Sequence, residues 1–341
     1  MMNQSKFGET MLKVENLFID IPTPAGILHA VHGVGFTLKR GETLGIVGES
    51  GCGKSVTIMA VMGLLPKHID IRADCLQFLD VDLLNLTERQ FADIRGERIA
   101  MIFQEPMTAL NPVFTIGNQL TEAYLRHRSG SRAEAQDKAI DLLDRVGITS
   151  AKRRLGQYPH QLSGGLRQRV MIAMVLMCDP DVIIADEPTT ALDVTIQAQI
   201  LALLADLQKE TGAAMILVSH DLGVISRVAD KVMVMYAGRE VESGSAKDIF
   251  SNPIHPYTQG LFSCIPVPGK KQRGSELGSI PGVVPSLIGD LKGCMFRPRC
   301  DLAHDACMGE LPYLKISEGH GAWCTSSQDE LRSRAEKVAL L

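Results

Sequence analysis

Residues that could bind phosphate are grouped in one short stretch of the chain. The pattern G-x-x-x-x-G-K-[ST] is matched by Gly48, Glu49, Ser50, Gly51, Cys52, Gly53, Lys54 and Ser55. Glycines in such a loop let backbone N–H groups turn inward around phosphate oxygens, at a helix N-terminus whose partial positive charge favours anions. Lys54 would reach the β- and γ-phosphates, and the Ser55 hydroxyl would ligate Mg²⁺. We therefore predict a phosphate-binding loop, and we include Thr57 in the following helix among its binding residues.

The residues on either side of the loop have the pattern that this interpretation requires. Residues 44–47 form an apolar run typical of a buried strand, and residues 56–65 form an apolar run compatible with a helix. A chance turn rich in glycine and serine is the alternative, but such a turn needs no strand before it and no helix after it. The context favours a strand, a phosphate loop and a helix in that order.

Two acidic residues follow a second apolar run. Asp186 and Glu187 end the sequence Asp-Val-Ile-Ile-Ala-Asp-Glu, and an open α/β sheet presents its ligand-binding groups at such strand ends. The aspartate could hold Mg²⁺ directly or through water, and the glutamate could polarise or deprotonate an attacking water. An acidic turn before Pro188 is the alternative. Together with the phosphate loop, the pair predicts a site for metal-assisted hydrolysis.

Two further polar residues lie at predicted strand ends. His220 follows a predicted buried strand at residues 213–219 and could donate a hydrogen bond to charge that develops on the γ-phosphate. A lone histidine is more often structural, but its strand-end position favours the catalytic interpretation. Gln104 follows the apolar residues 99–103 and could ligate the metal or sense the water, or it could be an ordinary loop amide.

These groups need a scaffold of strands and helices. Residues 11–20 and 27–38 have the pattern of β-strands, separated by a turn with Pro22, Pro24 and Gly26. The later strands are nearly continuous apolar runs that alternate with helices, which is typical of a parallel sheet covered on both faces. We therefore predict an α/β fold of the P-loop NTPase type, with a mostly parallel sheet and N-terminal antiparallel strands.

Two segments depart from this alternation. Residues from about 105 to 175 begin with a loop and continue as helices, one of which starts at a capping box formed by Ser131 and Glu134. Eight of the 16 prolines lie beyond residue 252. We predict a nucleotide-binding domain at residues 11–250 with a helical insertion, followed by a small loop-rich domain at residues 251–341.

Composition limits the classes of partner. The net charge of −4 does not indicate nucleic acid as a binding partner. The longest apolar run, residues 170–178, is much shorter than the about 18 residues that a membrane span requires. The N-terminal residues do not have the pattern of a secretory signal. We expect a cytoplasmic protein without a membrane span, whose eight cysteines are mostly reduced thiols or metal ligands.

Four cysteines are concentrated near the C-terminal end. Cys294, Cys300, Cys307 and Cys324 have the spacing C-x5-C-x6-C-x16-C. Four thiolates would satisfy a 4Fe–4S cluster or a Zn²⁺ site, and the absence of a C-x2-C pair favours the cluster over zinc. Four free cysteines that pack a small proline-rich domain are the alternative.

The order of these motifs resembles that of a known family. The phosphate loop, Gln104, Leu-Ser-Gly-Gly at residues 162–165, the acidic pair, Ala191-Leu-Asp193 and His220 follow one another as in the nucleotide-binding subunit of ATP-binding cassette (ABC) transporters. The resemblance covers about residues 11–250. It implies ATP as the nucleotide and a head-to-tail dimer of cassettes. In that dimer Ser163, Gly164 and Gly165 would face the γ-phosphate of ATP held by the partner cassette, and Asp193 would lie at the dimer interface, cap a helix, or do both.

The loop at residues 103–112 and the tail that begins at residues 252–257 are similar to the dipeptide and oligopeptide importer branch of this family. The resemblance implies an ATP-hydrolysing subunit that powers import of peptides or similar small solutes through two separate transmembrane permease subunits. It also implies a second ABC ATPase subunit of different sequence, an indirect link to a solute-binding protein, and a peripheral location on the cytoplasmic face of the bacterial inner membrane. Some members of this branch carry a 4Fe–4S cluster at such cysteines.

Other functions agree with the same cassette chemistry. One is a soluble ABC ATPase that acts on nucleic acid or ribosomes, and another is import of nickel, glutathione or another non-peptide solute. A third interpretation makes the cysteine tail a redox sensor that gates the ATPase. The single cassette, the acidic net charge and the importer-like tail argue against the soluble ATPase, whereas the solute stays open.

The sequence departs from the family pattern in two places. Position 166 is leucine where the wider family often has glutamine, which leaves the Ser-Gly-Gly donors unchanged. Residues 23–31 contain no aromatic side chain other than His29, although the family often stacks an aromatic ring on adenine there. The second departure leaves the preference for ATP over GTP open.

Overall fold

The structure is a computed structural model that describes residues 8–105, 109–190, 192–264, 279–289 and 291–339. The chain divides into two compact units, each built from segments that are distant in sequence. The first unit contains Met1–Leu12, Thr37–Thr43 and Phe78–Val218, and the second contains Lys13–Phe36, Leu44–Gln77 and Ser219–Leu341. Within the described residues, no helix is both long and apolar enough to cross a membrane.

The first unit has a parallel sheet of buried strands. Strand β7 (Ile99–Ile102) pairs with β8 (Val182–Asp186), and β8 pairs with β9 (Ala214–Ser219). Every residue of the three strands is buried, as expected for parallel strands covered on both faces. The predicted apolar runs therefore form a parallel sheet, and their carboxyl ends lie along one edge.

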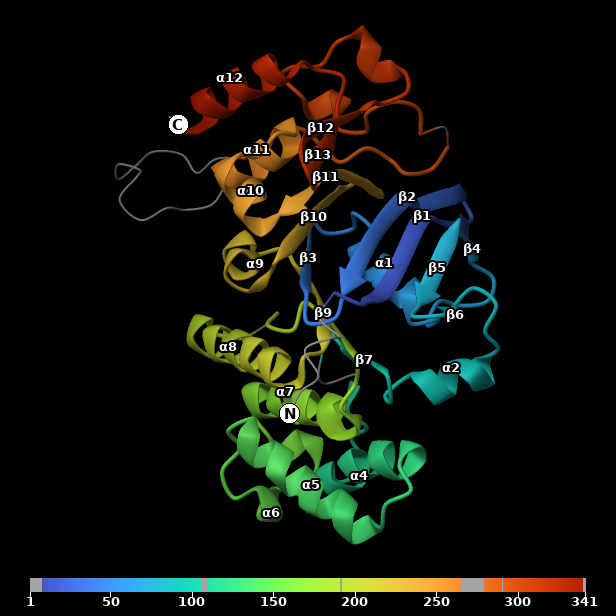
Figure 1. Ribbon diagram of the computed structural model, residues 1–341, viewed down its shortest axis with the longest axis vertical. Coiled ribbons are helices and arrows are strands. Elements are labelled where there is room, and N and C mark those ends of the chain that lie inside the picture. Colours follow the sequence, from blue (N-terminus) through green and yellow to red (C-terminus); the bar gives the residue numbers. More distant parts are fainter. Residues whose placement is uncertain (1–7, 106–108, 191, 265–278, 290, 340–341) are drawn as a thin grey trace. The chain divides into compact units, whose positions relative to one another are not determined.

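Helices make up most of the rest of the first unit. Their bounds are α2 (Glu88–Ile94), α4 (Ile116–His127), α5 (Arg132–Arg145), α6 (Ala151–Arg154), α7 (Gly164–Val175) and α8 (Val194–Thr211), with 3₁₀ turns η2 (Pro159–Gln161) and η3 (Leu176–Cys178) and the short strand β6 (Val81–Asp82). Figure 1 shows α4, α5, α6 and α7 gathered in one cluster. In the described residues of the segment expected to be helical, helices α4 to α7 are joined by loops and short turns.

Helix α5 begins where the sequence predicts. The backbone N–H of Glu134 donates to Ser131 Oγ over 3.2 Å, and the backbone N–H of Ser131 donates to the Glu134 carboxylate over 2.6 Å. This reciprocal capping box satisfies N–H groups that have no partner inside the helix. Ala135, Ala139 and Leu142 are buried on one face, so α5 is amphipathic.

The second unit contains most of the two long N-terminal strands. Strand β1 (Thr10–Thr23) lies between β2 (Gly26–Lys39) and β5 (Cys75–Phe78), and it also pairs with β4 (Asp70–Arg72) in antiparallel fashion. The turn between β1 and β2 is shorter than predicted, because Pro22 remains inside β1. Proline is tolerated there only where its missing N–H is not needed by a neighbouring strand.

A second group of strands leads from the phosphate loop to the C-terminal segment, by which we mean the described part of residues 251–341. Strand β3 (Thr43–Val47) is parallel to β10 (Lys231–Tyr236), and β10 is antiparallel to β11 (Arg239–Ser245). Strand β13 (His320–Trp323) pairs with β11 and with β12 (Tyr313–Ser317). The C-terminal segment thus adds a hairpin to the edge of β11, which the loop-rich prediction did not anticipate.

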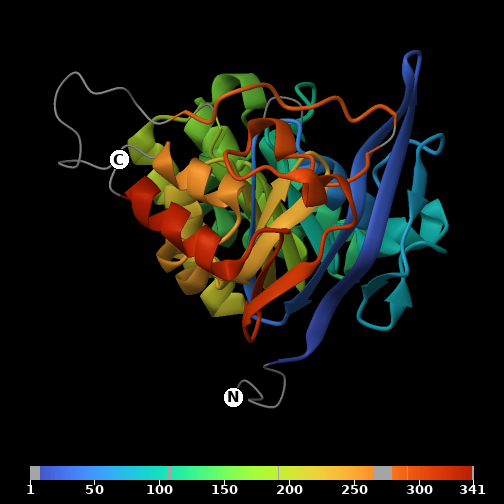
Figure 2. The same cartoon turned by 90° about the horizontal axis from the view of Figure 1, so that it is seen from above.

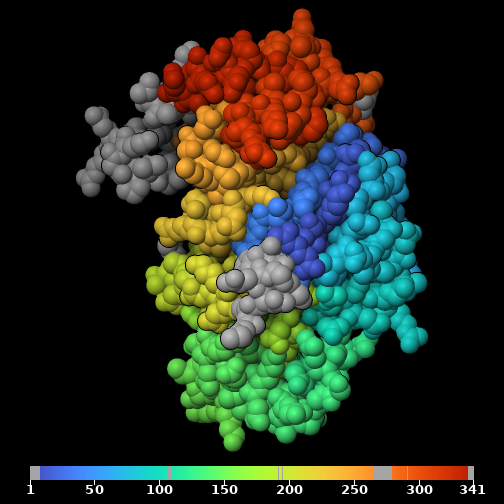
Figure 3. Space-filling view, in the orientation of Figure 1, coloured from blue at the N-terminus to red at the C-terminus, as the bar shows by residue number. Residues whose placement is uncertain are grey.

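The helices of the second unit are α1 (Lys54–Val61), α9 (Leu222–Val228), α10 (Ala246–Ser251), α11 (Pro256–Ser263) and α12 (Gln328–Ala339), with 3₁₀ turns η4 (Arg297–Arg299) and η5 (Asp305–Met308). Figures 1 and 2 both show α12 beside α11. Figure 3 shows the C-terminal residues in red packed against the orange residues of α10 and α11. Within this unit the C-terminal segment is integrated with the strands and helices that precede it.

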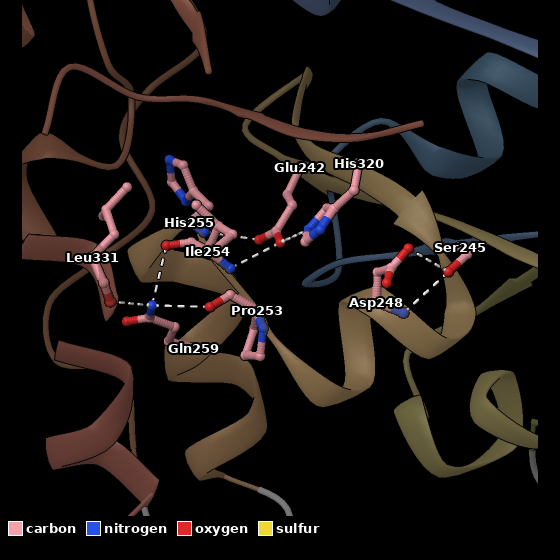
Figure 4. Close-up of polar contacts among 9 residues, drawn as sticks. All are labelled: Glu242, Ser245, Asp248, Pro253, Ile254, His255, Gln259, His320 and Leu331. Carbon is pink, nitrogen blue, oxygen red and sulfur yellow. Dashed lines mark hydrogen bonds and ion pairs between the residues drawn. The ribbon is translucent and has the colours of Figure 1, made fainter. Parts of the chain in front are cut away.

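A buried carboxylate fixes the start of this segment (Figure 4). Glu242 on β11 is 0% exposed and accepts hydrogen bonds from the backbone N–H groups of Ile254 and His255, each over 2.8 Å. His320 Nε2 on β13 lies 2.9 Å from the same carboxylate. Gln259 Nε2 donates to carbonyl groups that include Leu331 O at 2.9 Å. Because buried charges require hydrogen-bonding partners, this network ties β11, α11, β13 and α12 together.

Candidate functional site

The phosphate loop has a backbone that only glycine can adopt at two positions. Gly48 has φ of 156° and Gly53 has φ of 101°, both in the region that side chains rarely occupy. A Cβ atom on Gly48 would lie 2.2 Å from the carbonyl oxygen of Met235, and one on Gly53 would lie 2.6 Å from that of Ala30. Gly51 also has positive φ, but a Cβ atom there would meet open space. The sequence therefore forms a tight turn that leads directly into α1.

Lys54 is the first residue of α1 and its side chain is held against the loop. Its Nζ donates to Gly48 O over 2.9 Å and to Glu49 O over 3.0 Å, and the residue is only 5% exposed. The Cys52 thiol lies 3.8 Å from the same Nζ, and burial raises the pKa of this thiol. The ammonium group is thus placed at the centre of the loop, where the motif predicts phosphate binding.

The remaining residues of the predicted loop differ in exposure. Ser50 and Gly51 are exposed, and Ser55 is partly buried at the start of α1. Thr57 is completely buried, and its hydroxyl donates to Gly53 O over 2.9 Å. The Thr57 side chain therefore stabilises the turn that positions Lys54.

Two residues from distant parts of the second unit hold Glu49, the second residue of the loop. The backbone N–H of Glu49 donates to Tyr257 Oη over 2.9 Å. Arg299 Nη1 donates to both carboxylate oxygens of Glu49, at 2.9 and 3.1 Å. Sequence reasoning missed both residues. The only available signal was the arginine beside Cys300, which resembles any solvated charge.

His220 directly follows strand β9 and is exposed. The next residue, Asp221, caps α9 by accepting from the backbone N–H groups of Gly223 and Val224, at 2.8 and 3.3 Å. Its own N–H donates to Ser219 Oγ over 3.0 Å. The strand end and the helix cap together fix the backbone that carries the imidazole.

The first unit brings Gln104 and Glu187 together. Strands β7 and β8 are in register with Ile102 opposite Ala185, so the residues two positions beyond this pair, Gln104 and Glu187, meet. Gln104 Nε2 donates to Glu187 Oε2 over 3.1 Å, and Thr190 Oγ1 donates to the same oxygen over 2.9 Å. These two donors hold the Glu187 carboxylate in one orientation beyond the strand end.

The backbone at Glu187 is unusual. Glu187 has φ of 44°, in the left-handed region, and its N–H donates to Val218 O over 3.0 Å. A non-glycine residue in that conformation is strained and is often functional. Asp186 is the last residue of β8 and is 5% exposed, so one carboxylate is buried at the strand end and the next turns toward Gln104.

Ser163, Gly164 and Gly165 form the N-terminus of α7. Ser163 Oγ accepts from the Leu166 N–H over 3.4 Å, and both Ser163 and Gly164 are exposed. Asp193 is the N-cap of α8, where its Oδ1 accepts from the Ile196 N–H over 2.9 Å. The predicted cap is confirmed, whereas Ala191 of the same motif lies outside the described residues.

The four C-terminal cysteines line one small cavity of about 10 Å³, together with residues of η4 and α11. Burial raises the pKa of the Cys294 and Cys324 thiols and raises the pKa of Cys300 to about 11. Cys307 Sγ lies 3.1 Å from Thr325 Oγ1. Burial alone disfavours the thiolate form, but four sulfur atoms around one cavity are a donor set that a thiolate-ligated group could use. Among the described residues, however, no group of three or more Cys, His, Asp or Glu side chains has an arrangement that could hold a metal ion.

Comparison with known proteins identifies the family of the chain. A family model described as ABC transporter matches residues 31–190, and one described as the C-terminal region of oligopeptide/dipeptide transporters matches residues 241–307. The chain is 49% identical over 334 residues to the dipeptide transport ATP-binding protein DppD of Bacillus subtilis. The aligned region covers 97% of this chain and 98% of that protein. It is 48% identical over 324 residues to the oligopeptide transport ATP-binding protein OppD of Salmonella typhimurium, with coverage of 95% and 96%.

Solved structures agree on the fold. The dimeric post-hydrolysis structure of the ATP-binding cassette MJ0796 bound to ADP and Pi has a TM-score of 0.61 and 28% identity, and the match covers 69% of this chain and 99% of that chain. The structure of cbiO1 from Clostridium perfringens has a TM-score of 0.60 and 29% identity, covering 72% and 92%. With the phosphate loop and both family matches in place, the chain belongs to the ABC transporter family, as an ATPase subunit of its oligopeptide and dipeptide branch.

Proposed function

We propose that this chain is the ATP-hydrolysing subunit that powers import of dipeptides, oligopeptides or similar small solutes through separate membrane permease subunits. The observation that carries the proposal is similarity over nearly the whole chain to proteins named for peptide transport, including the region after the cassette. A cassette alone occurs in many transporters, so the match of residues 241–307 is what favours this branch.

In this proposal the phosphate loop binds ATP. Lys54 and the loop amides hold the phosphates, in the geometry that Gly48 and Gly53 allow. Ser55, Gln104 and Asp186 would hold Mg²⁺, because hydroxyl, amide and carboxylate oxygens are the ligands that this ion prefers. A Mg²⁺ ion held by these residues would supply positive charge that offsets the charge of the phosphates.

The hydrolytic role falls to Glu187 and His220. Glu187 would accept a proton from the attacking water, and the donors Gln104 and Thr190 keep its carboxylate oriented. His220 would donate a hydrogen bond to charge that develops on the γ-phosphate. Ser163, Gly164 and Gly165, at the exposed start of α7, would act on ATP held by a second cassette.

The same proposal assigns domains, partners and location. Residues 11–250 form the nucleotide-binding domain, with the helices between about 105 and 175 as the insertion that contacts the permeases, and residues 251–341 form the C-terminal domain. The partners are two permease subunits and a second ABC ATPase subunit of different sequence, with an indirect link to a solute-binding protein. The chain would lie peripherally on the cytoplasmic face of the bacterial inner membrane, in agreement with the lack of a membrane-spanning helix among the described residues.

Co-purification tests the transport assignment. The tagged chain is extracted from native membranes in mild detergent, and the proteins that accompany it in stoichiometric amounts are identified by mass spectrometry. Two permease subunits and a second cassette are expected. A chain that purifies with ribosomes or nucleic acid, or alone, would retain the ATPase chemistry but would contradict the transport assignment.

The four-cysteine cavity is proposed as the site of a 4Fe–4S cluster. What supports this proposal is the convergence of four buried or half-buried sulfur donors on one cavity. Anaerobic purification followed by iron, sulfide and zinc analysis tests it. We expect about four iron and four sulfide per chain. Zinc alone would assign a different metal, and the absence of metal would leave the cysteines with a packing role.

A further inference from the structure

A chain of contacts connects the C-terminal segment to the phosphate-binding lysine. Arg299, on η4, donates to both carboxylate oxygens of Glu49. The carbonyl oxygen of Glu49 in turn accepts from Lys54 Nζ over 3.0 Å. Glu49 therefore contacts Arg299 through its side chain and Lys54 through its backbone carbonyl.

Hydrogen bonds to groups outside the phosphate loop also position the Arg299 side chain. Its side chain is only 6% exposed, its Nη2 donates to Ile280 O over 3.0 Å, and its Nε donates to Pro281 O over 3.0 Å. The Tyr236 hydroxyl lies 3.3 Å from Nη1. Burial alone would lower the pKa of Arg299, but hydrogen bonds to Glu49 and Tyr236 outweigh it and raise the pKa. A guanidinium with these partners has one preferred position.

A second contact restrains the backbone of the same residue. Tyr257 is completely buried on α11 and accepts from the Glu49 N–H over 2.9 Å. Its ring packs against Tyr236 and Phe296, with centroid distances of 4.6 and 5.4 Å. The N–H, the carbonyl and the carboxylate of Glu49 therefore all have defined partners, so this residue of the loop is restrained at three points.

We propose that Arg299 is a positioning residue for ATP binding, which acts through Glu49 to keep the phosphate loop and Lys54 in the binding conformation. This inference rests on the proposed role of the phosphate loop. It adds that the C-terminal segment, which the nucleotide-binding motifs do not include, raises the affinity of this cassette for ATP. Preorganisation of this kind increases affinity because less conformational freedom is lost when the ligand binds.

The proposal is tested on the full-length chain by measuring the dissociation constant for Mg·ATP and the KM and kcat of ATP hydrolysis. Arg299→Met removes the donors but keeps an unbranched apolar side chain. Glu49→Gln keeps the shape of the partner but removes its charge. We expect each variant to raise the dissociation constant and the KM by about tenfold with little change in kcat, because one charge-assisted interaction is lost. Arg299→Lys should give an intermediate value.

Two comparisons separate positioning from general stability. Arg334→Met removes another arginine of the C-terminal segment, one that pairs with Asp301 and Gln259 but not with the loop. It should leave the dissociation constant unchanged. The double variant Arg299→Met with Glu49→Gln should bind ATP no more weakly than either single variant, because both act through one contact.

Three results would overturn the inference: unchanged affinity in Arg299→Met and Glu49→Gln, additive losses in the double variant, or an equal loss in Arg334→Met. If Arg299→Met does not fold, as judged by its thermal midpoint without nucleotide, the Glu49→Gln result decides. A wild-type chain that does not bind ATP would reject the proposed phosphate loop and this inference together. A wild-type chain that binds normally alongside unaffected variants would reject this inference alone.

Discussion

Glu187 combines a strained backbone with a carboxylate that accepts two hydrogen bonds. Its replacement by glutamine keeps the size of the side chain and an oxygen that can accept from Thr190. The amide cannot take a proton from water, so we expect Glu187→Gln to bind ATP like the wild type and to lose about 10²- to 10⁴-fold in turnover. Equilibrium ATP binding and steady-state hydrolysis in the assembled complex measure the two effects.

A matched control is available for this prediction. Glu336→Gln makes the same chemical change at an exposed position on α12. It should leave both binding and turnover unchanged. Near-normal turnover of Glu187→Gln, or an equal loss in Glu336→Gln, would remove Glu187 from the proposed role.

Single residues differ in how well the sequence predicts their surroundings. The strand-end positions of Gln104 and Glu187 could be predicted because apolar runs mark the strands, and parallel pairing then brings the residues together. The partners of Glu49 could not be predicted. Tyr257 and Arg299 lie more than 200 residues further along the chain, and no local pattern indicates which distant side chain will reach a loop.

At the level of the element, two glycines of the phosphate loop differ in how much space surrounds them. In Gly48→Ala the new methyl group would lie 2.2 Å from Met235 O, and neither backbone can move without disturbing β3 or β10. We expect this variant to lose ATP binding. Gly51→Ala meets no neighbour and adds only the strain of a positive φ, about 1 kcal/mol.

Thermal unfolding and ATP binding of the two variants provide the measurement. A large loss of binding in Gly48→Ala with a small loss in Gly51→Ala is the expected pattern. Equal effects would show that strain, and not the contact with β10, determines the requirement for glycine.

Helix α5 provides a pH-dependent prediction. Hydrogen bonds from the backbone and the hydroxyl of Ser131 lower the pKa of Glu134. A carboxyl whose pKa is lower in the folded state stabilises the fold above its unfolded pKa, near 4.3, and this contribution is lost as the pH falls through the folded value. Glu134→Gln should therefore lower the free energy of unfolding at pH 7 and have a smaller effect at about pH 3.

Urea unfolding of the wild type and Glu134→Gln at both pH values measures this difference. Glu122→Gln, on the exposed surface of α4, is a suitable control with no capping role. A Glu134→Gln effect that is independent of pH would contradict the capping interpretation.

Elements with strong local signals are the ones that the sequence predicts well. Helix α5 has a capping box and an amphipathic pattern, and β8 and β9 are uninterrupted apolar runs. Strands β4, β6 and β12 were missed. They are short, and most of their residues are exposed or partly exposed, so their pairing is determined by tertiary contacts and not by an apolar period.

At the scale of the molecule, the C-terminal segment has its own small core, and the sequence indicates its composition but not its connections. Ile254, Ala322, Cys324 and Leu331 form one buried cluster that joins the start of α11, β13 and α12. Prolines predict loops, yet they do not reveal that β13 extends the edge of β11. The buried Glu242 appears in the sequence as an ordinary charged residue between two strand residues.

Glu242 therefore gives the prediction that concerns the whole C-terminal segment. Removing its carboxylate in Glu242→Ala leaves the N–H groups of Ile254 and His255 buried without their acceptor, and it leaves His320 without its partner. Breaking a buried pair in this way costs about 3–5 kcal/mol. Glu242→Gln retains one acceptor oxygen, so it should lose less. Glu318→Ala, which removes an exposed carboxylate from the turn between β12 and β13, should change the free energy of unfolding by only about 0.5 kcal/mol.

The single tryptophan of the chain, Trp323, lies at the end of β13 and reports on this region. We expect its fluorescence to show unfolding of the C-terminal segment at lower urea in Glu242→Ala than in the wild type, with Glu242→Gln between them. Because the same segment supplies Tyr257 and Arg299 to the phosphate loop, ATP affinity should fall in the same order. The tryptophan transition could shift while ATP affinity stays constant. In that case the Glu242 network stabilises the C-terminal segment but does not support the phosphate loop.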